Sequence, residues 1–282
     1  MNLSKFSFFT GYYIKKHLLK NVTANDIFLK RFFRFASKVP GKAIKRSDEE
    51  IVYSIENVNG KPLQVSIRGG ASSDVMVVTQ VFFNKEYNPV VQAIAKWQPQ
   101  NKIEFIIDAG ANAGYTTCYF KAFFPAATVV AIEPDSENAK QVRKNFLQNN
   151  FSDLTLIEGG LWPKDSWLEL KNDFRDGKDW SFYVVESTVE TDLKGYSFES
   201  ILKQFDRSTI DLLKIDIEGG EKEFFGHPVM MDNVLRKTKF LAIEIHDETG
   251  IRDTIYESLK RNGFEWFNQG ELTIATNKNM VR

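Results

Sequence analysis

Between residues 103 and 262, short apolar runs alternate with segments in which apolar residues recur at helical spacing. The apolar runs predict strands at 103–107, 127–132, 154–158, 211–216 and 239–245. The segments between and after them predict helices at 115–123, 136–149, 198–205, 220–225 and 249–262. Strands that alternate with helices in this way favour a mainly parallel sheet with helices on both faces. The chain is therefore predicted to be a doubly wound α/β protein.

Other apolar runs predict hairpins and a region that precedes the main sheet. Runs at 264–267 and 272–275, joined by a short turn, predict a C-terminal antiparallel hairpin that closes the sheet. Runs at 167–170 and 181–185 predict a second hairpin. Three further runs predict strands at 51–55, 63–67 and 75–83. We expect three parts: a basic helical extension (1–46), a lead-in with short strands (47–100) and the main domain (101–282).

The first 46 residues are predicted to be helical and are strongly basic. A capping box from Thr23 to Asp26 precedes a helix with a phenylalanine-rich face. The segment holds eleven Lys and Arg against one acid, which gives it a charge of +10 in a chain of zero net charge. Either this helix packs on the main domain with its lysines solvated, or it binds an anionic membrane surface. Nucleic acid is not expected as a partner, because the remainder of the chain is acidic.

Composition limits the class and the compartment of the protein. With 282 residues, 43% hydrophobic and 26% charged, the chain can bury a substantial core and is not disordered throughout. Its single cysteine, Cys118, cannot form an intrachain disulfide. No apolar run approaches the ~20 residues of a membrane-spanning helix. We expect a cytoplasmic protein, at the membrane periphery if residues 1–46 bind lipid, and a homo-oligomer is compatible with the sequence.

A glycine-containing turn follows the first strand of the main domain and indicates a ligand. After Asp108, glycines at 110 and 114 allow a sharp bend and a close approach of ligand to backbone. A dinucleotide fingerprint, Gly-x-Gly-x-x-Gly, would need glycine where Asn112 and Tyr115 stand. An acid at the strand end also disfavours a phosphate. S-adenosylmethionine fits, since its amino-acid and sulfonium parts are cationic.

A second acid stands where a nucleoside would need it. Glu133 ends the next predicted strand, 25 positions beyond Asp108, which suits an acid that accepts both ribose hydroxyls. The acid and glycines at 158–160, after the third strand, are expected on the adenine side. The predicted cofactor contacts are Asp108, Gly110, Ala111, Asn112, Gly114, Tyr115, Glu133, Pro134, Glu158, Gly159 and Gly160.

The remaining strand ends carry the candidate catalytic residues. Asp216 and Glu218 follow one strand, with Lys214 on the same face, and Glu244 and His246 follow the last parallel strand. His246 alone among the three histidines stands at the ligand edge, where it could accept a proton at neutral pH. A structural histidine and an ion-pair cluster remain alternatives. Asp216, Glu218 and His246 could also hold Mg or Ca, but without a compact ligand motif no metal is predicted.

Four motifs together resemble the FkbM family of S-adenosylmethionine-dependent methyltransferases. They are Asp108-Ala109-Gly110-Ala111-Asn112-Ala113-Gly114, Ala131-Ile132-Glu133-Pro134-Asp135, Asp211-Leu212-Leu213-Lys214-Ile215-Asp216-Ile217-Glu218-Gly219-Gly220-Glu221 and Ile243-Glu244-Ile245-His246. The segment 68–87, with Ser73-Asp74, is similar to the family's lead-in, and the likeness extends over roughly 60–277. The resemblance implies a seven-stranded, Rossmann-like methyltransferase sheet and O-methylation, often of a sugar or polyketide hydroxyl. It does not cover 1–46, and 162–197 departs from the pattern.

The predicted function is therefore S-adenosylmethionine-dependent O-methylation of a hydroxyl on a sugar, polysaccharide precursor or related small metabolite. His246, Asp216, Glu218, Glu244 and Lys214 would face the acceptor. The alternative is a non-catalytic interaction protein with a Rossmann fold, attached to a membrane by its basic N-terminus.

Overall fold

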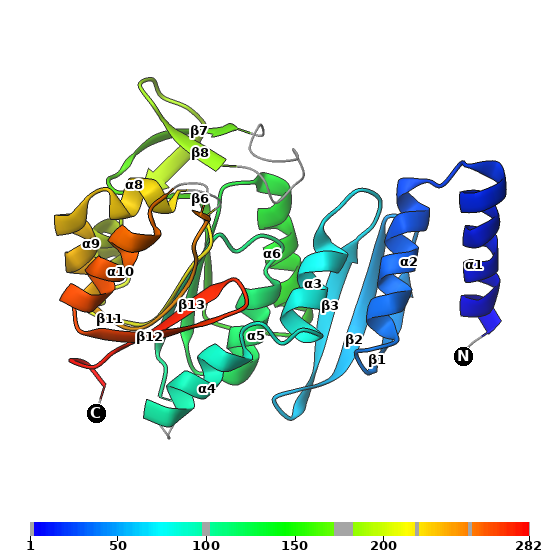
Figure 1. Ribbon diagram of the computed structural model, residues 1–282, viewed down its shortest axis with the longest axis horizontal. Coiled ribbons are helices and arrows are strands. Elements are labelled where there is room, and N and C mark those ends of the chain that lie inside the picture. Colours follow the sequence, from blue (N-terminus) through cyan, green and yellow to red (C-terminus); the bar gives the residue numbers. More distant parts are fainter. Residues whose placement is uncertain (1–2, 98–101, 172–182, 218–219, 248–249, 282) are drawn as a thin grey trace. The chain divides into compact units, whose positions relative to one another are not determined.

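The computed structural model describes residues 3–97, 102–171, 183–217, 220–247 and 250–281 (Figure 1). The chain divides into two compact units, Met1–Lys85 and Glu86–Arg282. This division differs from the three predicted parts. The boundary expected after residue 46 separates two paired strands, β1 (Gly41–Arg46) and β2 (Glu50–Val58), because the chain from 41 to 46 is a strand and not a helix.

The first unit combines helices with a small antiparallel sheet. Its helices are α1 (Leu3–Ile14), the π-helix η1 (Lys15–Leu19), α2 (Ala24–Ala36) and α3 (Asp74–Phe82), and its sheet has the order β1-β2-β3, with β3 at Lys61–Arg68. The predicted capping box at Thr23 and Asp26 is present at the start of α2. Buried Phe32 and Phe35 of this helix pack edge-on against Tyr53 of β2.

The prediction of a strand at 75–83 is wrong, because this segment forms helix α3. Its β-branched residues favour a strand locally, but the buried side chains Val75, Val78, Val81 and Phe82 recur at helical spacing. The helix start is also fixed by side chains. The backbone N–H of Asp74 donates to Ser72 Oγ, and the Asp74 carboxylate accepts from the backbone and guanidinium of Arg68. Tertiary packing and this clamp outweigh the local strand propensity.

The second unit is an α/β sheet with the predicted alternation. Its strands are β4 (Phe105–Ala109), β5 (Thr128–Glu133), β6 (Leu154–Leu161), β7 (Ser166–Lys171), β8 (Tyr183–Ser187), β9 (Leu193–Tyr196), β10 (Ile210–Ile215), β11 (Thr238–Glu244), β12 (Phe264–Gln269) and β13 (Leu272–Asn277). Its helices are α4 (Asn88–Trp97), α5 (Tyr115–Phe123), α6 (Ser136–Gln148), α7 (Phe198–Gln204), α8 (Glu221–Phe225), α9 (Pro228–Leu235) and α10 (Arg252–Arg261). Helices α4 and α9 and strand β9 were not predicted.

The strand order is β12-β13-β11-β10-β4-β5-β6-β9-β7-β8. Strands β11, β10, β4, β5, β6 and β9 run parallel, and β12–β13 forms the predicted antiparallel hairpin at one edge. The β7–β8 hairpin is also confirmed, although residues 181–182 of the predicted run lie outside the described residues. The second unit is thus an α/β fold with a mostly parallel central sheet.

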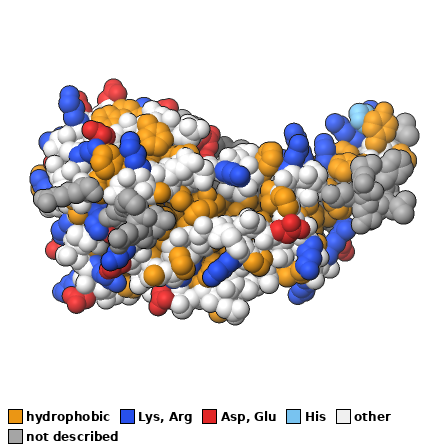
Figure 2. Space-filling model, turned by 90° about the horizontal axis from the view of Figure 1, so that it is seen from below, with side chains coloured by type: hydrophobic (Ala, Val, Ile, Leu, Met, Phe, Trp, Pro, Cys, Tyr) orange, Lys and Arg blue, Asp and Glu red, His pale blue; other side chains and the backbone are white. Residues whose placement is uncertain are grey.

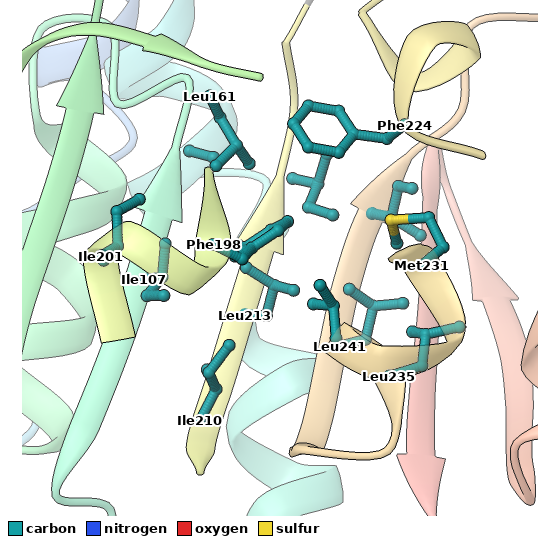
Figure 3. Packing of buried hydrophobic residues seen from close by; sticks show 14 of the residues in the cluster. Ile107, Leu161, Phe198, Ile201, Ile210, Leu213, Phe224, Met231, Leu235 and Leu241 are labelled. Carbon is teal, nitrogen blue, oxygen red and sulfur yellow. The ribbon is translucent and has the colours of Figure 1, made fainter. Parts of the chain in front are cut away.

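The sheet core positions the ligand edge. One face of the sheet packs against α7 to α10, while α5 and α6 lie on the other face (Figure 1). In Figure 3, Leu213 and Leu241 of neighbouring strands belong to one buried cluster with the helix side chains Phe198 and Met231. The chain reverses its direction of winding at β4, whose neighbours are β5 and β10. In open α/β sheets such a point is where ligands bind. Among the helices of the described residues, none is long and apolar enough to cross a membrane.

Candidate active site

The turn after β4 brings three strand ends together. Gly110 has φ +76°, and a Cβ on it would lie 1.6 Å from the carbonyl oxygen of Asp216. Gly114 has φ +80°, and its Cβ would approach the Cα atom of Val142 in α6 to 3.0 Å. Both glycines are therefore required by the protein's own backbone. The backbone N–H of Gly110 also donates to the carbonyl of Ile132 in β5, so the turn is held between β5 and the end of β10.

A buried lysine joins two of the predicted acids. The Nζ atom of Lys214 lies 3.3 Å from Asp108 Oδ1 and 3.4 Å from Asp216 Oδ2, and donates to the carbonyl oxygen of Gly110 at 2.6 Å. Burial favours the neutral amine, but Asp216 and Asp108 outweigh it and hold the pKa of Lys214 well above its ordinary value. Lys214 is thus a fixed cation and no base. With two carboxylates and one ammonium, this strand-end cluster carries a net negative charge.

The predicted Asp108 faces the protein interior. Its side chain is fully buried, and Oδ2 accepts a hydrogen bond from Thr117 Oγ1 at 2.6 Å. Cys118 follows in α5, also fully buried, where burial and the nearby Asp108 raise the pKa of its thiol. Ala111 and Tyr115 are buried as well. Asn112, between them, is half-buried, and its Oδ1 accepts a hydrogen bond from the backbone N–H of Ala113 at 2.6 Å.

Glu133 stands at the end of β5, beside the turn. Its Oε2 accepts from the backbone N–H of Asn112 at 2.7 Å, and its Oε1 from that of Asp135 at 3.0 Å, with Pro134 between the acid and the second donor. Its side chain is 5% exposed, and burial raises its pKa to about 7, although these backbone donors oppose the shift. The structure therefore brings together the turn and the second predicted acid.

The segment predicted for the adenine side lies within β6. Gly159 and Gly160 lie where the strand pairs with β9: a Cβ would come within 2.6 Å of the carbonyl oxygen of Lys194 and of Leu168 Cδ1, respectively. Glu158 is exposed and forms an ion pair with Arg143 of α6. Strand packing is thus sufficient to explain both glycines.

The acceptor-side residues meet beyond β10 and β11. His246 is 2% exposed; its Nδ1 lies 3.0 Å from Glu221 Oε1, and its Nε2 lies 3.6 Å from Glu244 Oε1. Asp216, Glu244 and His246 place ligand atoms within 4.8 Å of one another, a spacing that a divalent cation could bridge. Glu218 lies outside the described residues.

A cavity of about 410 Å³ opens beside His246. Most of its lining is polar, and it is formed by Glu244, Ile245, His246, Asp247, Arg252, Asn268, Gly270, Glu271, Leu272 and Thr273. The second half of this set comes from the β12–β13 hairpin and its turn. Sequence patterns placed no ligand contact there, because the hairpin reaches the site only through its pairing with β11.

Two acids near the site were not predicted. Burial, with the nearby charges of Asp216 and Glu271, raises the pKa of Glu86 to about 7. Glu221 forms the buried contact with His246. Glu86 belongs to no motif, whereas Glu221 ends the motif Gly219-Gly220-Glu221 and could have been singled out there.

Comparison with known proteins identifies the family. Residues 108–266 match the family described as Methyltransferase FkbM domain, which is more than half of the chain. The chain belongs to this family of methyltransferases. It is 26% identical over 187 residues to Methyltransferase 1 of Beauveria bassiana, covering 57% of this chain and 72% of that protein. Methyltransferase sdnD of Sordaria araneosa is also 26% identical, over 57% of this chain and 73% of its own length.

A solved structure of the METTL16 methyltransferase domain aligns with a TM-score of 0.42 and 16% identity. The alignment covers 69% of this chain and 66% of that one, slightly less than two thirds of its length.

Proposed function

We propose that the protein is an S-adenosylmethionine-dependent O-methyltransferase that binds its cofactor at the turn after β4 and its acceptor in the cavity beside His246. Membership of the FkbM methyltransferase family supports methyl transfer as the reaction. The observation that carries the cofactor proposal is the buried Glu133 carboxyl, which ends β5 beside the turn at the point where the sheet reverses.

Glu133 can accept hydroxyl groups in addition to its protein contacts. Each carboxylate oxygen has two lone pairs. The backbone donors at Asn112 and Asp135 use one on each oxygen, and Asn138 Nδ2 donates to Oε1 over a longer distance of 3.4 Å. Oε2 therefore keeps a lone pair for one ribose hydroxyl, and a second hydroxyl would replace the long contact with Asn138. A bound carboxylate would also make charge-assisted hydrogen bonds, which are stronger than neutral ones.

Electrostatics at the turn favour a cationic ligand. Lys214 contributes one ammonium group, whereas Asp108 and Asp216 on either side of it contribute two carboxylates. A sulfonium and an α-amino group complement this charge, whereas a pyrophosphate would be repelled. The cofactor supplies a methyl group on a cationic sulfur, and the protein's task is to orient the acceptor oxygen and to remove its proton.

The acceptor cavity suits a small hydroxyl-rich molecule. Its side-chain amide, hydroxyl, guanidinium and carboxylate groups offer donors and acceptors, and the β12–β13 hairpin contributes Asn268 and Thr273. We assign proton removal to His246, whose imidazole lines this cavity. Sugars and polysaccharide precursors are the proposed acceptor class. Glu86, which lies near Asp216 and whose pKa is raised to about 7, is the second candidate for proton removal.

Calorimetry with three ligands tests the proposal. S-adenosylmethionine and S-adenosylhomocysteine should bind, and NAD should not. A panel of sugars and sugar derivatives, supplied with isotopically labelled cofactor, should then reveal a labelled product. Absence of cofactor binding at millimolar concentration would leave the non-catalytic interaction protein as the better proposal. If chelator abolishes transfer and Mg restores it, the three groups at Asp216, Glu244 and His246 hold a cation.

A further inference from the structure

We propose that Glu221 is a positioning residue that holds His246 in the tautomer with hydrogen on Nδ1, so that the Nε2 lone pair faces the acceptor side. The catalytic consequence rests on the proposed function, whereas the tautomer itself is a property of the protein alone.

The contact is buried and joins distant parts of the chain. Glu221 is the first residue of α8, and His246 follows β11, 25 positions later. The Glu221 side chain is fully buried, and the distance from His246 Nδ1 to Glu221 Oε1 is 3.0 Å. Glu221 Oε1 also accepts a long hydrogen bond of 3.4 Å from the backbone N–H of Ile217. The carboxylate is thus fixed by the chain that follows β10.

Hydrogen-bond chemistry then determines the tautomer. An ionised carboxylate can only accept, so a ring nitrogen within hydrogen-bond distance of one carries the hydrogen. Nδ1 is 3.0 Å from Glu221 Oε1, whereas Nε2 is 3.6 Å from Glu244 Oε1, which is too long for a hydrogen bond. A neutral imidazole has one N–H, and a hydrogen on Nδ1 leaves a lone pair on Nε2. The reverse tautomer would set two lone pairs against each other at 3.0 Å inside the protein. A buried mismatch of this kind is costly because neither group can turn to water.

The groups around the imidazole ring show which part of the site Nε2 faces. Glu244 Oε1 lies 3.6 Å from Nε2, and the ligand atoms of Asp216 and His246 fall within 4.8 Å of one another. Asp247 is the adjacent residue and contributes a further charge. Nε2 therefore faces the strand ends, while Nδ1 faces α8. When Nε2 takes a proton from an acceptor hydroxyl, Glu221 stabilises the imidazolium from the opposite side.

Nitrogen NMR tests the tautomer directly. The chain has only three histidines, so protein labelled with ¹⁵N-histidine gives few signals, and His246→Gln assigns the one of interest. We expect the unmodified protein, free of metal and cofactor, to show Nδ1–H at His246 at alkaline pH. Glu221→Leu should shift the ring toward Nε2–H, the tautomer that free histidine favours. Glu244→Gln, which changes the group on the other side of the ring, should retain Nδ1–H.

A result of Nε2–H in the unmodified protein overturns the proposal, even if Glu221→Leu fails to fold. In activity assays, Glu221→Leu should lower kcat by ~10- to 100-fold, a share of the effect of a general base, with cofactor affinity unchanged. If Nδ1–H is observed but no hydroxyl is methylated, the positioning role stands and the proposed function fails. An unchanged kcat with a changed tautomer would limit Glu221 to a structural role.

Discussion

The backbone of Gly110 lies where any side chain would meet the carbonyl oxygen of Asp216. A glycine in a turn beside a ligand site is easily read as room for the ligand. Here it first makes room for the neighbouring strand end, so a substitution at this position reports on folding before it reports on binding.

We expect Gly110→Ala to destabilise the protein by more than ~3 kcal/mol or to prevent folding, because both backbone strain and a backbone contact oppose it. Gly270 is the matched control: its φ is +61°, but nothing lies within 4 Å of a Cβ there. Gly270→Ala should cost only ~1 kcal/mol of strain. Urea unfolding of both variants measures the difference, and equal losses would contradict the close approach to Asp216.

Glu133→Ala should weaken binding of S-adenosylmethionine by ~1–3 kcal/mol through loss of hydrogen bonds to the ribose. Because the ionised form is the better acceptor and its pKa is about 7, cofactor affinity should rise as the pH increases from 6 to 8. Calorimetry across this range measures both effects. The rise should disappear in Glu133→Ala but persist in Glu137→Ala, which alters an exposed pair with Lys140.

The same raised pKa sets a direction for stability. The folded protein holds the Glu133 proton more tightly than the unfolded chain does, because folding raises the pKa of this carboxyl from its ordinary value of 4.5 to about 7. The contribution of Glu133 to stability is therefore complete below pH 4.5 and is lost as the pH rises to about 7. Cofactor binding and folding therefore prefer opposite protonation states of one carboxyl.

His246→Gln should lower turnover by ~10²- to 10⁴-fold and leave cofactor affinity unchanged, because the residue acts on the acceptor proton. His227→Gln is the control: His227 is exposed and precedes α9, away from the acceptor cavity. Initial rates with a labelled cofactor and calorimetry separate the two effects. Full activity of His246→Gln would transfer the assignment to Glu86 or Asp216.

At the scale of elements, periodicity predicted the parallel sheet because buried strands and amphipathic helices leave different patterns along the chain. It failed for α3, whose valines suit a strand equally well. The deciding contact, Arg68 with Asp74, requires β3 and the helix to be in place. Local patterns cannot contain it.

We expect Asp74→Ala to cost about 2–4 kcal/mol of stability, since it leaves the Arg68 guanidinium and backbone N–H without their buried acceptor. Glu137→Ala, at the exposed pair with Lys140, should change stability by less than ~0.5 kcal/mol. Thermal and denaturant unfolding test this. Similar effects of the two substitutions would show that the clamp does not hold α3.

Sequence patterns predicted the site residues that lie at strand ends, but not the tertiary contacts that these residues make. Asp108, Glu133 and Asp216 each end a strand that periodicity identifies, so topology alone places them at one edge. Lys214 was expected to face the acceptor, but two carboxylates hold it in the interior. The contact of Glu221 with His246 arises only when the fold brings the start of α8 to the segment that follows β11.

At the scale of the molecule, charge is distributed unevenly. In the first unit, α2 places Lys30, Arg31 and Arg34 on its exposed face, while its phenylalanines are buried. Exposed Phe9 and Tyr13 of α1 add hydrophobic surface. Figure 2 shows basic and hydrophobic side chains together over this part of the chain, at the right of the view. Such a surface suits an anionic membrane.

We expect the full chain to sediment with vesicles that contain anionic lipid at low salt and to detach at high salt, because each basic side chain near the surface adds ~1 kcal/mol that salt screens. Charge reversal of Lys30, Arg31 and Arg34 together should abolish sedimentation. Reversal of three exposed basic residues of the second unit, Lys140, Lys222 and Lys260, is the control. Binding that ignores salt, or no binding, would favour a solvated helix face.

Cys118, the one thiol of the chain, is fully buried in the helix that follows the turn after β4. A thiol reagent can reach it only when α5 separates from its neighbours, so the labelling rate measures how often that opening occurs. Because the proposed cofactor would bind the turn that leads into this helix, it should slow the labelling of Cys118. The chain thus carries an intrinsic probe of occupancy that needs no engineered label.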